Sequence, residues 1–156
     1  MKVAVITISD RASRGEYDDL SGPVIERDLM ARFPASVVSR AIVPDEPDRI
    51  LAALQSAASS DFILTTGGTG ISPRDVTPEI TAKFCDREIP GIADAIRSAS
   101  LAEAPAAMLS RGYAGVRGTC IVVNFPGSVK AVRLCFQVIA PVMEHALRML
   151  RGEGHP

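Results

Sequence analysis

Residues 3–8 form a short, almost uninterrupted apolar run, VAVITI, which is rich in β-branched residues. A strand of this composition is typical of a parallel sheet, in which both faces are buried, because a half-exposed strand alternates apolar and polar residues. The beginning of the chain therefore predicts a parallel α/β sheet.

Three further segments resemble strands, and helical segments alternate with them. The other predicted strands cover residues 36–43, 62–64 and 121–123. Helices are predicted to start at Ser21, Pro47, Thr77 and Pro90, and to cover residues 105–109 and 129–150. This alternation predicts a single α/β domain over residues 1–156, with a mostly parallel sheet and helices on both faces.

Proline and glycine set the finer expectations. Thr77 followed by Pro78 is typical of a helix N-cap with proline at the first helical position. Pro141 lies inside the last helical segment and predicts a kink or a break there. Residues 112–118 contain three glycines, which favours a turn or loop over a strand.

Composition excludes several classes of function. A net charge of −1 gives no general basic field for nucleic acid or anionic lipid. No apolar run approaches the ~20 residues that span a bilayer, and Asp10 follows the first strand too early for a signal-peptide core. We therefore expect a cytoplasmic protein without a nucleic-acid or membrane partner.

Cysteine and histidine are too sparse for the commonest kinds of metal and nucleophile chemistry. The cysteines, Cys85, Cys120 and Cys135, have no paired spacing, which argues against a zinc ribbon or a disulfide framework. With only two histidines, a Ser-His-Asp triad or a histidine metal site is not expected. Any catalysis would depend on carboxylates, backbone amides, hydroxyls and a cation taken up from solution or with the substrate.

Each predicted strand ends in a polar or glycine-rich loop. These loops cover residues 9–10, 44–46, 67–77 and 124–128. Ligands in open α/β sheets bind beyond the carboxyl ends of the strands, so we expect the four loops to meet at one edge.

The loop after the third strand predicts a phosphate cradle. Its glycines permit positive φ angles and leave backbone amides open to an anion; they are Gly67, Gly68 and Gly70. Its threonines, Thr65, Thr66 and Thr69, add hydroxyl donors. The loop is neither a Walker A motif nor a Rossmann fingerprint, because no Gly-Lys-Ser/Thr follows it and Pro73 occupies the third glycine position. A plain tight turn is the alternative interpretation.

Acidic residues accompany this loop. Asp75 lies five residues beyond Gly70, and Asp45 with Glu46 ends the second strand. Mg²⁺ takes one or two carboxylates together with phosphate oxygens, so these acids are candidate ligands. The alternative is that Asp75 and Asp45 only cap a turn or a helix.

Four segments together resemble the MogA/MoaB family of molybdenum cofactor biosynthesis. They are residues 8–13 (ISDRAS), 43–46 (VPDE), 65–78 (TTGGTGISPRDVTP) and 124–128 (NFPGS). The resemblance covers almost the whole chain, in order and at the family's spacing. One mild departure is Phe125 before Pro126-Gly127, where the family usually has leucine.

This resemblance implies a compact α/β domain, usually a trimer or a larger assembly of trimers such as a hexamer. It also implies transfer of the adenylyl group of Mg-ATP to molybdopterin, with release of pyrophosphate. The positions that match the family's catalytic acids are Asp45 and Asp75, which would hold Mg²⁺ directly or through water. Implied substrate- or phosphate-binding residues are Ser9, Asp10, Thr66, Gly67, Gly68, Thr69, Gly70, Ser110, Pro126, Gly127 and Ser128. The product would pass to a molybdenum insertase.

The resemblance also leaves alternatives open. Some MoaB-like members are non-catalytic pterin-binding proteins, but retention of both Asp45 and Asp75 favours the enzyme. A hydrolase like the competence-damage relatives is disfavoured by the short chain. For the homotrimer, the apolar residues of the last helical segment could supply surface or could line the core; they are Val138, Ile139, Val142, Met143, Leu147 and Leu150.

Overall fold

The computed structural model describes residues 1–153 and contains one six-stranded sheet. In chain order the strands are β1 (Lys2–Ile8), β2 (Val37–Val43), β3 (Phe62–Thr66), β4 (Arg87–Glu88), β5 (Ala114–Arg117) and β6 (Cys120–Phe125). Their order across the sheet is β2-β1-β3-β6-β5-β4. The first four strands in that order are mutually parallel, as the apolar runs predicted.

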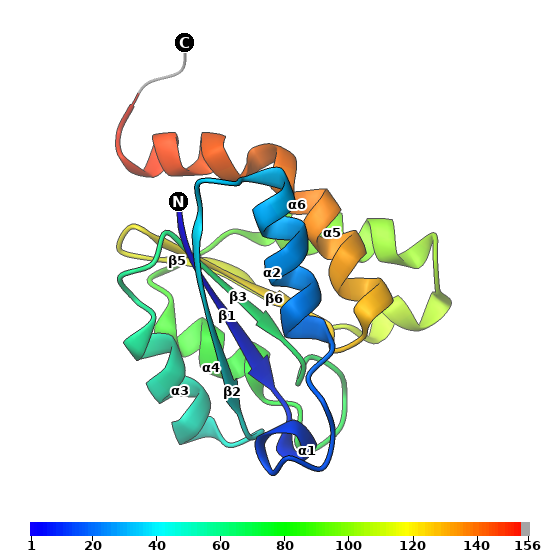
Figure 1. Ribbon diagram of the computed structural model, residues 1–156. Coiled ribbons are helices and arrows are strands. Elements are labelled where there is room, and N and C mark those ends of the chain that lie inside the picture. Colours follow the sequence, from blue (N-terminus) through cyan, green and yellow to red (C-terminus); the bar gives the residue numbers. More distant parts are fainter. Residues whose placement is uncertain (154–156) are drawn as a thin grey trace.

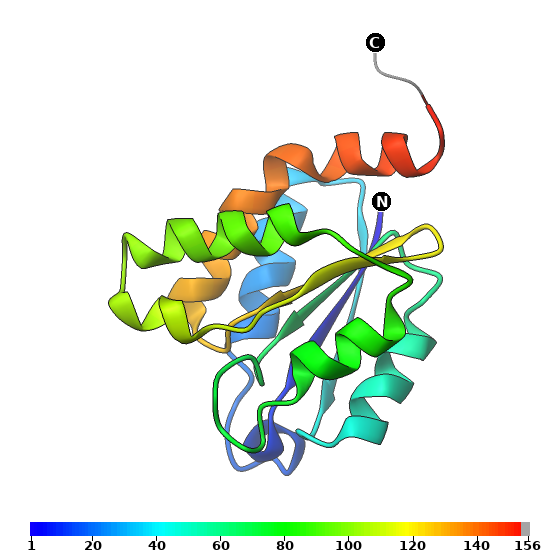
Figure 2. The ribbon, with the colours of Figure 1, turned by 180° about the vertical axis from the view of Figure 1, so that it is seen from behind.

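Helices cover both faces of the sheet. They are α1 (Asp10–Ser13), α2 (Ser21–Arg32), α3 (Pro47–Ser56), α4 (Thr77–Phe84), α5 (Pro90–Leu101), the 3₁₀ helix η1 (Pro105–Leu109) and α6 (Val129–Leu150). α2, α5 and α6 pack together on one face, and α3 and α4 pack on the other (Figures 1 and 2). The expected α/β fold with helices on both faces is therefore confirmed.

Burial follows each strand's place in the sheet. Every residue of β3 and β6 is buried, because helices cover both sides of the centre of the sheet. β2 lies at an edge, and most of its side chains are exposed, including Val37 at 67% and Ile42 at 43%. Among residues 1–153, no helix has the length and apolar character needed to cross a lipid bilayer.

The prediction of a loop over residues 112–118 is wrong. Ala114–Arg117 form β5, which pairs antiparallel with β6 through a tight turn at Gly118, where φ is +57°. Gly115 is needed for close packing, since a Cβ there would lie 2.7 Å from the carbonyl oxygen of Arg87 in β4. Glycine therefore permits the close approach of two strands here, although the glycine content of the segment is typical of a loop.

The structure corrects one helix prediction and confirms another. Val76, not Thr77, is the N-cap of α4, and the Thr77 hydroxyl instead donates to the carbonyl oxygen of Gly67 at 3.0 Å. α6 continues through Pro141 without a break but changes direction partway along its length (Figure 1). The expected kink is therefore present, as is usual for an internal proline.

Most of the apolar residues of α6 belong to the core of the subunit. Ile139, Met143 and Leu147 are buried, and Val138 and Leu150 pack against the same cluster. Val142, at 47% exposed, and Met149, at 56%, are the exceptions. α6 therefore has little apolar surface to spare, and the core alternative describes it better.

Candidate active site

The carboxyl ends of β1 and β3 form a topological switch point. The connection from β1 to β2 runs through α2 on one face, whereas the connection from β2 to β3 runs through α3 on the other. The two connections therefore lie on opposite faces of the sheet and leave a crevice between the carboxyl ends of β1 and β3, at the end of the strands where α1 lies (Figure 1). Ligands of open α/β sheets bind in the crevice at such a point.

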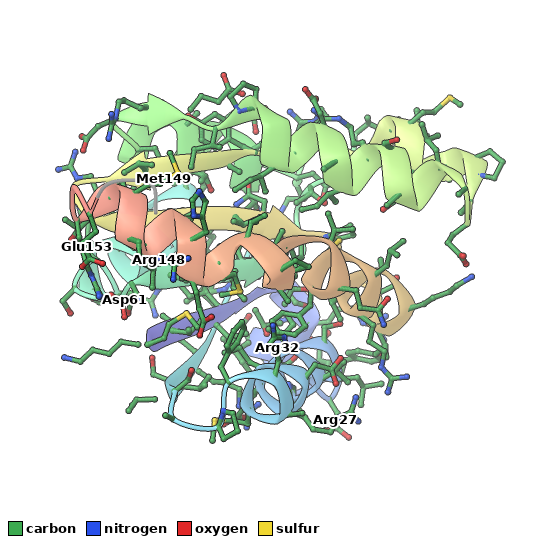
Figure 3. The ribbon with its side chains drawn as sticks, turned by 90° about the horizontal axis from the view of Figure 1, so that it is seen from above. Arg27, Arg32, Asp61, Arg148, Met149 and Glu153 are labelled. Carbon is green, nitrogen blue, oxygen red and sulfur yellow. The ribbon has the colours of Figure 1, made fainter. Side chains whose placement is uncertain are left out.

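The four predicted loops meet at this edge. Ser9 N–H donates to the carbonyl oxygen of Val43 at 2.9 Å, and Gly67 N–H donates to that of Phe125 at 3.1 Å. The Thr66 hydroxyl donates to the carbonyl oxygen of Pro126 at 2.7 Å. Hydrogen bonds thus join the loop after β1 to that after β2, and the loop after β3 to that after β6. Figure 3 shows the opposite end of the fold, where α2 and α6 end.

The glycine loop after β3 has two residues in the left-handed region. φ is +104° at Gly67 and +63° at Gly68, so both positions favour glycine. Gly70 does not have a positive φ, and our expectation for that residue is wrong. Glycine is required at position 70 for a different reason: a Cβ there would lie 2.9 Å from Oδ2 of Asp75.

Backbone amides of this loop are available to an anion. Within residues 1–153, the N–H groups of Gly68, Thr69 and Gly70 donate to no protein acceptor. Gly67 N–H is engaged by Phe125, so it cannot serve as we expected. Adjacent backbone amides without partners are the usual construction of a phosphate-binding loop.

Asp45 and Asp75 both adjoin this loop. Oδ1 of Asp45 lies 3.0 Å from the position of a Cβ at Gly68, and Asp75 lies against Gly70 in the same way. The Asp75 carboxylate also accepts the N–H of Ser72 at 2.9 Å, so it closes a turn. The structure therefore brings the two predicted acids to the same loop.

Asp45 carries an unfavourable charge. Burial raises the pKa of its carboxyl group, and the negative charges of Asp10 and Asp75 raise that pKa further. A cation between these acids would relieve both effects. Two carboxylates plus phosphate oxygens fit Mg²⁺, and the part of the chain that the structure describes holds no cluster of three His, Cys, Asp or Glu residues that could bind a metal alone.

Asp10 has a structural partner that the sequence did not reveal. Arg74 donates to both of its carboxylate oxygens, from Nε at 3.0 Å and from Nη2 at 2.8 Å. Arg74 joins the glycine loop to the loop after β1 in this way. The predicted hydroxyls of Ser9 and Ser128 are likewise engaged as N-caps of α1 and α6.

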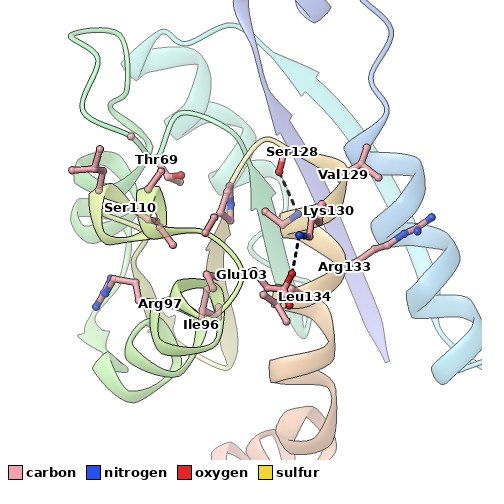
Figure 4. A pocket seen from close by; sticks show the side chains of 18 of the residues that line it. Thr69, Ile96, Arg97, Glu103, Ser110, Ser128, Val129, Lys130, Arg133 and Leu134 are labelled. Carbon is pink, nitrogen blue, oxygen red and sulfur yellow. Dashed lines mark hydrogen bonds and ion pairs between the residues drawn. The ribbon is translucent and has the colours of Figure 1, made fainter.

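A pocket of about 840 Å³ opens between α5, η1 and the start of α6 (Figure 4). Five predicted site residues line it: Thr69, Gly70, Ser110, Pro126 and Ser128. Much of the remaining wall is apolar, with Ile96, Ala104, Ala107, Leu109, Val129 and Leu134. A pocket of this size with an apolar wall and a few polar groups is typical of a small-molecule site.

A second pocket, of about 280 Å³, adjoins the first at Ser128. Its lining includes the predicted residues Ser9, Thr66, Gly67, Gly127 and Ser128. The acids Asp10, Asp45 and Asp75 line neither pocket; Asp45 and Asp75 lie against the glycine loop. The predicted site residues therefore belong to two adjoining pockets and to the acids beside the glycine loop.

Sequence reasoning missed the basic side chains of the larger pocket. Arg97, Lys130 and Arg133 line it; Lys130 is paired with Glu103 at 2.7 Å, whereas Arg133 has no acidic partner within residues 1–153 (Figure 4). The Ser100 hydroxyl, in the same wall, is a buried polar group without a hydrogen-bond partner in the described chain. No local motif marks these residues, because they come from two helices, α5 and α6, that are far apart in the sequence.

The fold and the site define a class: an α/β protein with a glycine loop of free backbone amides at its switch point and a large pocket beside it. Residues 4–145 match the family model "Probable molybdopterin binding domain", and the chain belongs to this family. A molybdopterin adenylyltransferase of Helicobacter pylori strain J99 is 36% identical over 96% of this chain and 88% of its own.

Solved structures agree with this assignment. One described as a substructure of MogA has a TM-score of 0.91 and 41% identity, over 96% of this chain and 99% of its own. The molybdopterin biosynthesis enzyme MoaB of Thermus thermophilus has a TM-score of 0.88 and 42% identity, over 97% and 96% of the two chains. The resemblance to the MogA/MoaB family is therefore confirmed.

Proposed function

We propose that this chain transfers the adenylyl group of Mg-ATP to molybdopterin. An oxygen of the terminal phosphate of molybdopterin forms a bond to the α-phosphorus of ATP, the bond between the α-phosphorus and the bridging oxygen breaks, and pyrophosphate leaves. The observation that carries the proposal is the placement of Asp45 and Asp75 against a glycine loop that has free amides.

In this proposal the glycine loop binds phosphate. The N–H groups of Gly68, Thr69 and Gly70 donate to phosphate oxygens, and α4 begins directly after the loop, so its positive end favours the same anion. Phosphoryl-type transfer needs mainly positioning and charge stabilisation, which fixed amides supply. No protein base is required, because a phosphate nucleophile is already ionised at pH 7.

Asp45 and Asp75 would hold Mg²⁺, directly or through water. When bound, the ion neutralises phosphate charge and helps pyrophosphate to leave. Without the ion, Asp45 lies in a partly buried position near Asp10 and Asp75, and its raised pKa reports that strain. A cation held by the two acids would offset the unfavourable charge of Asp45.

Molybdopterin would bind in the pocket of about 840 Å³. Its apolar wall suits a flat ring system, and Arg97, Lys130 and Arg133 offer positive charge to an anionic substituent. Thr69 and Gly70 line the same pocket, so its occupant would lie beside the phosphate cradle.

The direct test is incubation of the pure protein with molybdopterin and Mg-ATP. We expect release of pyrophosphate together with an adenylylated pterin. Binding of molybdopterin without pyrophosphate release would contradict the proposal and favour the non-catalytic, MoaB-like alternative. EDTA should abolish turnover and leave the fold intact.

The wider setting belongs to the same proposal. The chain forms a homotrimer, works in the cytoplasm and passes its product to a molybdenum insertase. Exposed apolar side chains on the edge strand β2, Val37 and Ile42, offer surface for association. Light scattering decides the assembly: a species of 16.5 kDa would refute the trimer, and one of three times that mass would support it.

A further inference from the structure

Arg111 contacts both ends of the loop that carries Asp75. It lies between η1 and β5, and its backbone N–H donates to the carbonyl oxygen of Thr69 at 2.9 Å. Its guanidinium donates from Nε to the carbonyl oxygen of Gly70 at 2.7 Å and from Nη2 to that of Asp75 at 2.6 Å. Nη1 is paired with the carboxylate of Glu79 in α4.

The loop between these anchor points has few other ties. Residues 71–74 are exposed and belong to no helix or strand, and Ile71 is 68% exposed. Their hydrogen bonds are those of the internal turn among Ser72, Arg74 and Asp75, and the pairing of Arg74 with Asp10. Two groups therefore close the stretch from Gly70 to Asp75 against the body of the domain: the Arg74–Asp10 pair near its middle, and Arg111 at both of its ends.

This closure sets the position of the Asp75 carboxylate. One guanidinium holds the carbonyl groups of Gly70 and Asp75, and the Asp75 carboxylate lies directly against Gly70. A planar guanidinium offers its donors in a fixed fork, which an ammonium group cannot reproduce. Arg111 can thus fix the relative placement of the acid and the free amides of the glycine loop.

We propose that Arg111 is a positioning residue, which clamps the Gly70–Asp75 loop so that the Asp75 carboxylate and the phosphate-binding amides keep one geometry. It acts through the loop, because the partners of its guanidinium are backbone carbonyl groups and Glu79. Its catalytic consequence rests on the proposed adenylyl transfer, whereas its effect on the loop does not.

The test compares Arg111→Ala and Arg111→Lys with two controls. Arg117→Ala removes an exposed guanidinium of β5 that pairs with Asp86 and stacks on Phe84, away from the loop. Glu79→Gln removes the charge of the third partner and leaves both carbonyl contacts available. We expect both controls to behave like the unaltered protein.

The first readout is hydrogen–deuterium exchange of residues 67–76. The informative amides are the hydrogen-bonded ones of Gly67, Ser72 and Asp75, because those of Gly68, Thr69 and Gly70 have no acceptor in the described chain and exchange fast in any case. We expect faster exchange confined to this segment in Arg111→Ala, a smaller increase in Arg111→Lys, and slower exchange again when guanidinium is added to Arg111→Ala at low millimolar concentration. The midpoint of thermal unfolding should change little, because the freed carbonyl groups face solvent. Unchanged exchange in Arg111→Ala would overturn the proposal.

Steady-state kinetics is the second readout. A displaced acid should lower kcat by about 10- to 100-fold with little change in KM for ATP. Faster exchange with unaltered kcat would also overturn the positioning role. If the unaltered protein does not adenylylate molybdopterin, the proposed function fails, and the exchange data alone then decide whether Arg111 clamps the loop.

Discussion

Asp10 and Asp45 exchange hydrogen bonds: the backbone N–H of each donates to the carboxylate of the other, at 2.8 Å and 3.0 Å. The two acids nevertheless differ in charge environment. The hydrogen bonds from Arg74 lower the pKa of Asp10, whereas burial raises that of Asp45. Arg74 thus offsets the charge of Asp10, whereas Asp45 has no ion pair within residues 1–153, and in the proposed function it is Asp45 that holds the cation.

Asp45→Asn should impair adenylylation without lowering stability. Because burial raises the pKa of Asp45 above its ordinary 3.8, the folded state holds this proton more tightly, and stability falls as pH rises through that interval. At pH 7 the charge therefore opposes folding. The amide removes the charge and can still accept the Asp10 N–H, so urea unfolding should show equal or greater stability. A clear loss of stability with full turnover would return Asp45 to a capping role.

Asp75→Asn should abolish most of the turnover. An amide oxygen can still accept the Ser72 N–H, so the turn and the fold should remain. The variant loses a negative ligand, and we expect kcat to fall by about 100-fold or more, in the range for loss of one strong electrostatic contact. The measurement is pyrophosphate release at saturating Mg-ATP, with circular dichroism as the control. Full activity in the folded variant would contradict the assignment.

Gly70→Val should weaken ligand binding with a modest loss of stability. The backbone at Gly70 is not left-handed, so strain comes from contact with the Asp75 carboxylate and not from φ. We expect a cost of about 1–3 kcal/mol in unfolding free energy, as for other overpacked positions. Gly91→Val is the matched control, because no atom lies within 4 Å of a Cβ there. Unchanged affinity for Mg-ATP by calorimetry would show that the loop is only a turn.

The cysteine thiols should be unreactive in the native protein. Burial raises the pKa of Cys85 to about 11 and those of Cys120 and Cys135 to about 12, so almost no thiolate exists at pH 8. Alkylation by iodoacetamide should be slow until urea exposes all three thiols. Cys85 is only partly buried, so the Cys85→Ser variant tests whether any labelling of the native protein occurs at this thiol. Rapid native labelling would contradict this account of their burial.

The central fold was predictable because its signal is local. A strand such as β1 or β3 must be apolar on both sides when helices cover both faces, and that pattern is visible in the sequence. β4 and β5 were not found, since β4 has only two residues and β5 contains Gly115 for close packing. Glycine alone does not reveal whether it serves a turn or a close contact.

The same limit applies to the site. Ser9, Asp45 and Gly67 could be predicted together because they follow parallel strands, whose carboxyl ends share one edge. The walls of the larger pocket come from α5, η1 and α6, where single residues such as Arg97 and Arg133 carry no motif. Only the packing of those elements brings them together.

The free amides of Gly68, Thr69 and Gly70 have a consequence for the entropy of ligand capture. Gly67 and Gly68 give up more backbone freedom on folding than other residues would, and they do so whether or not an anion is present. The loss is thus incurred when the chain folds and is not repeated when phosphate arrives. Phosphate should therefore meet a preformed receptor, and its association rate should be limited by diffusion and desolvation, with no slow ordering of the loop.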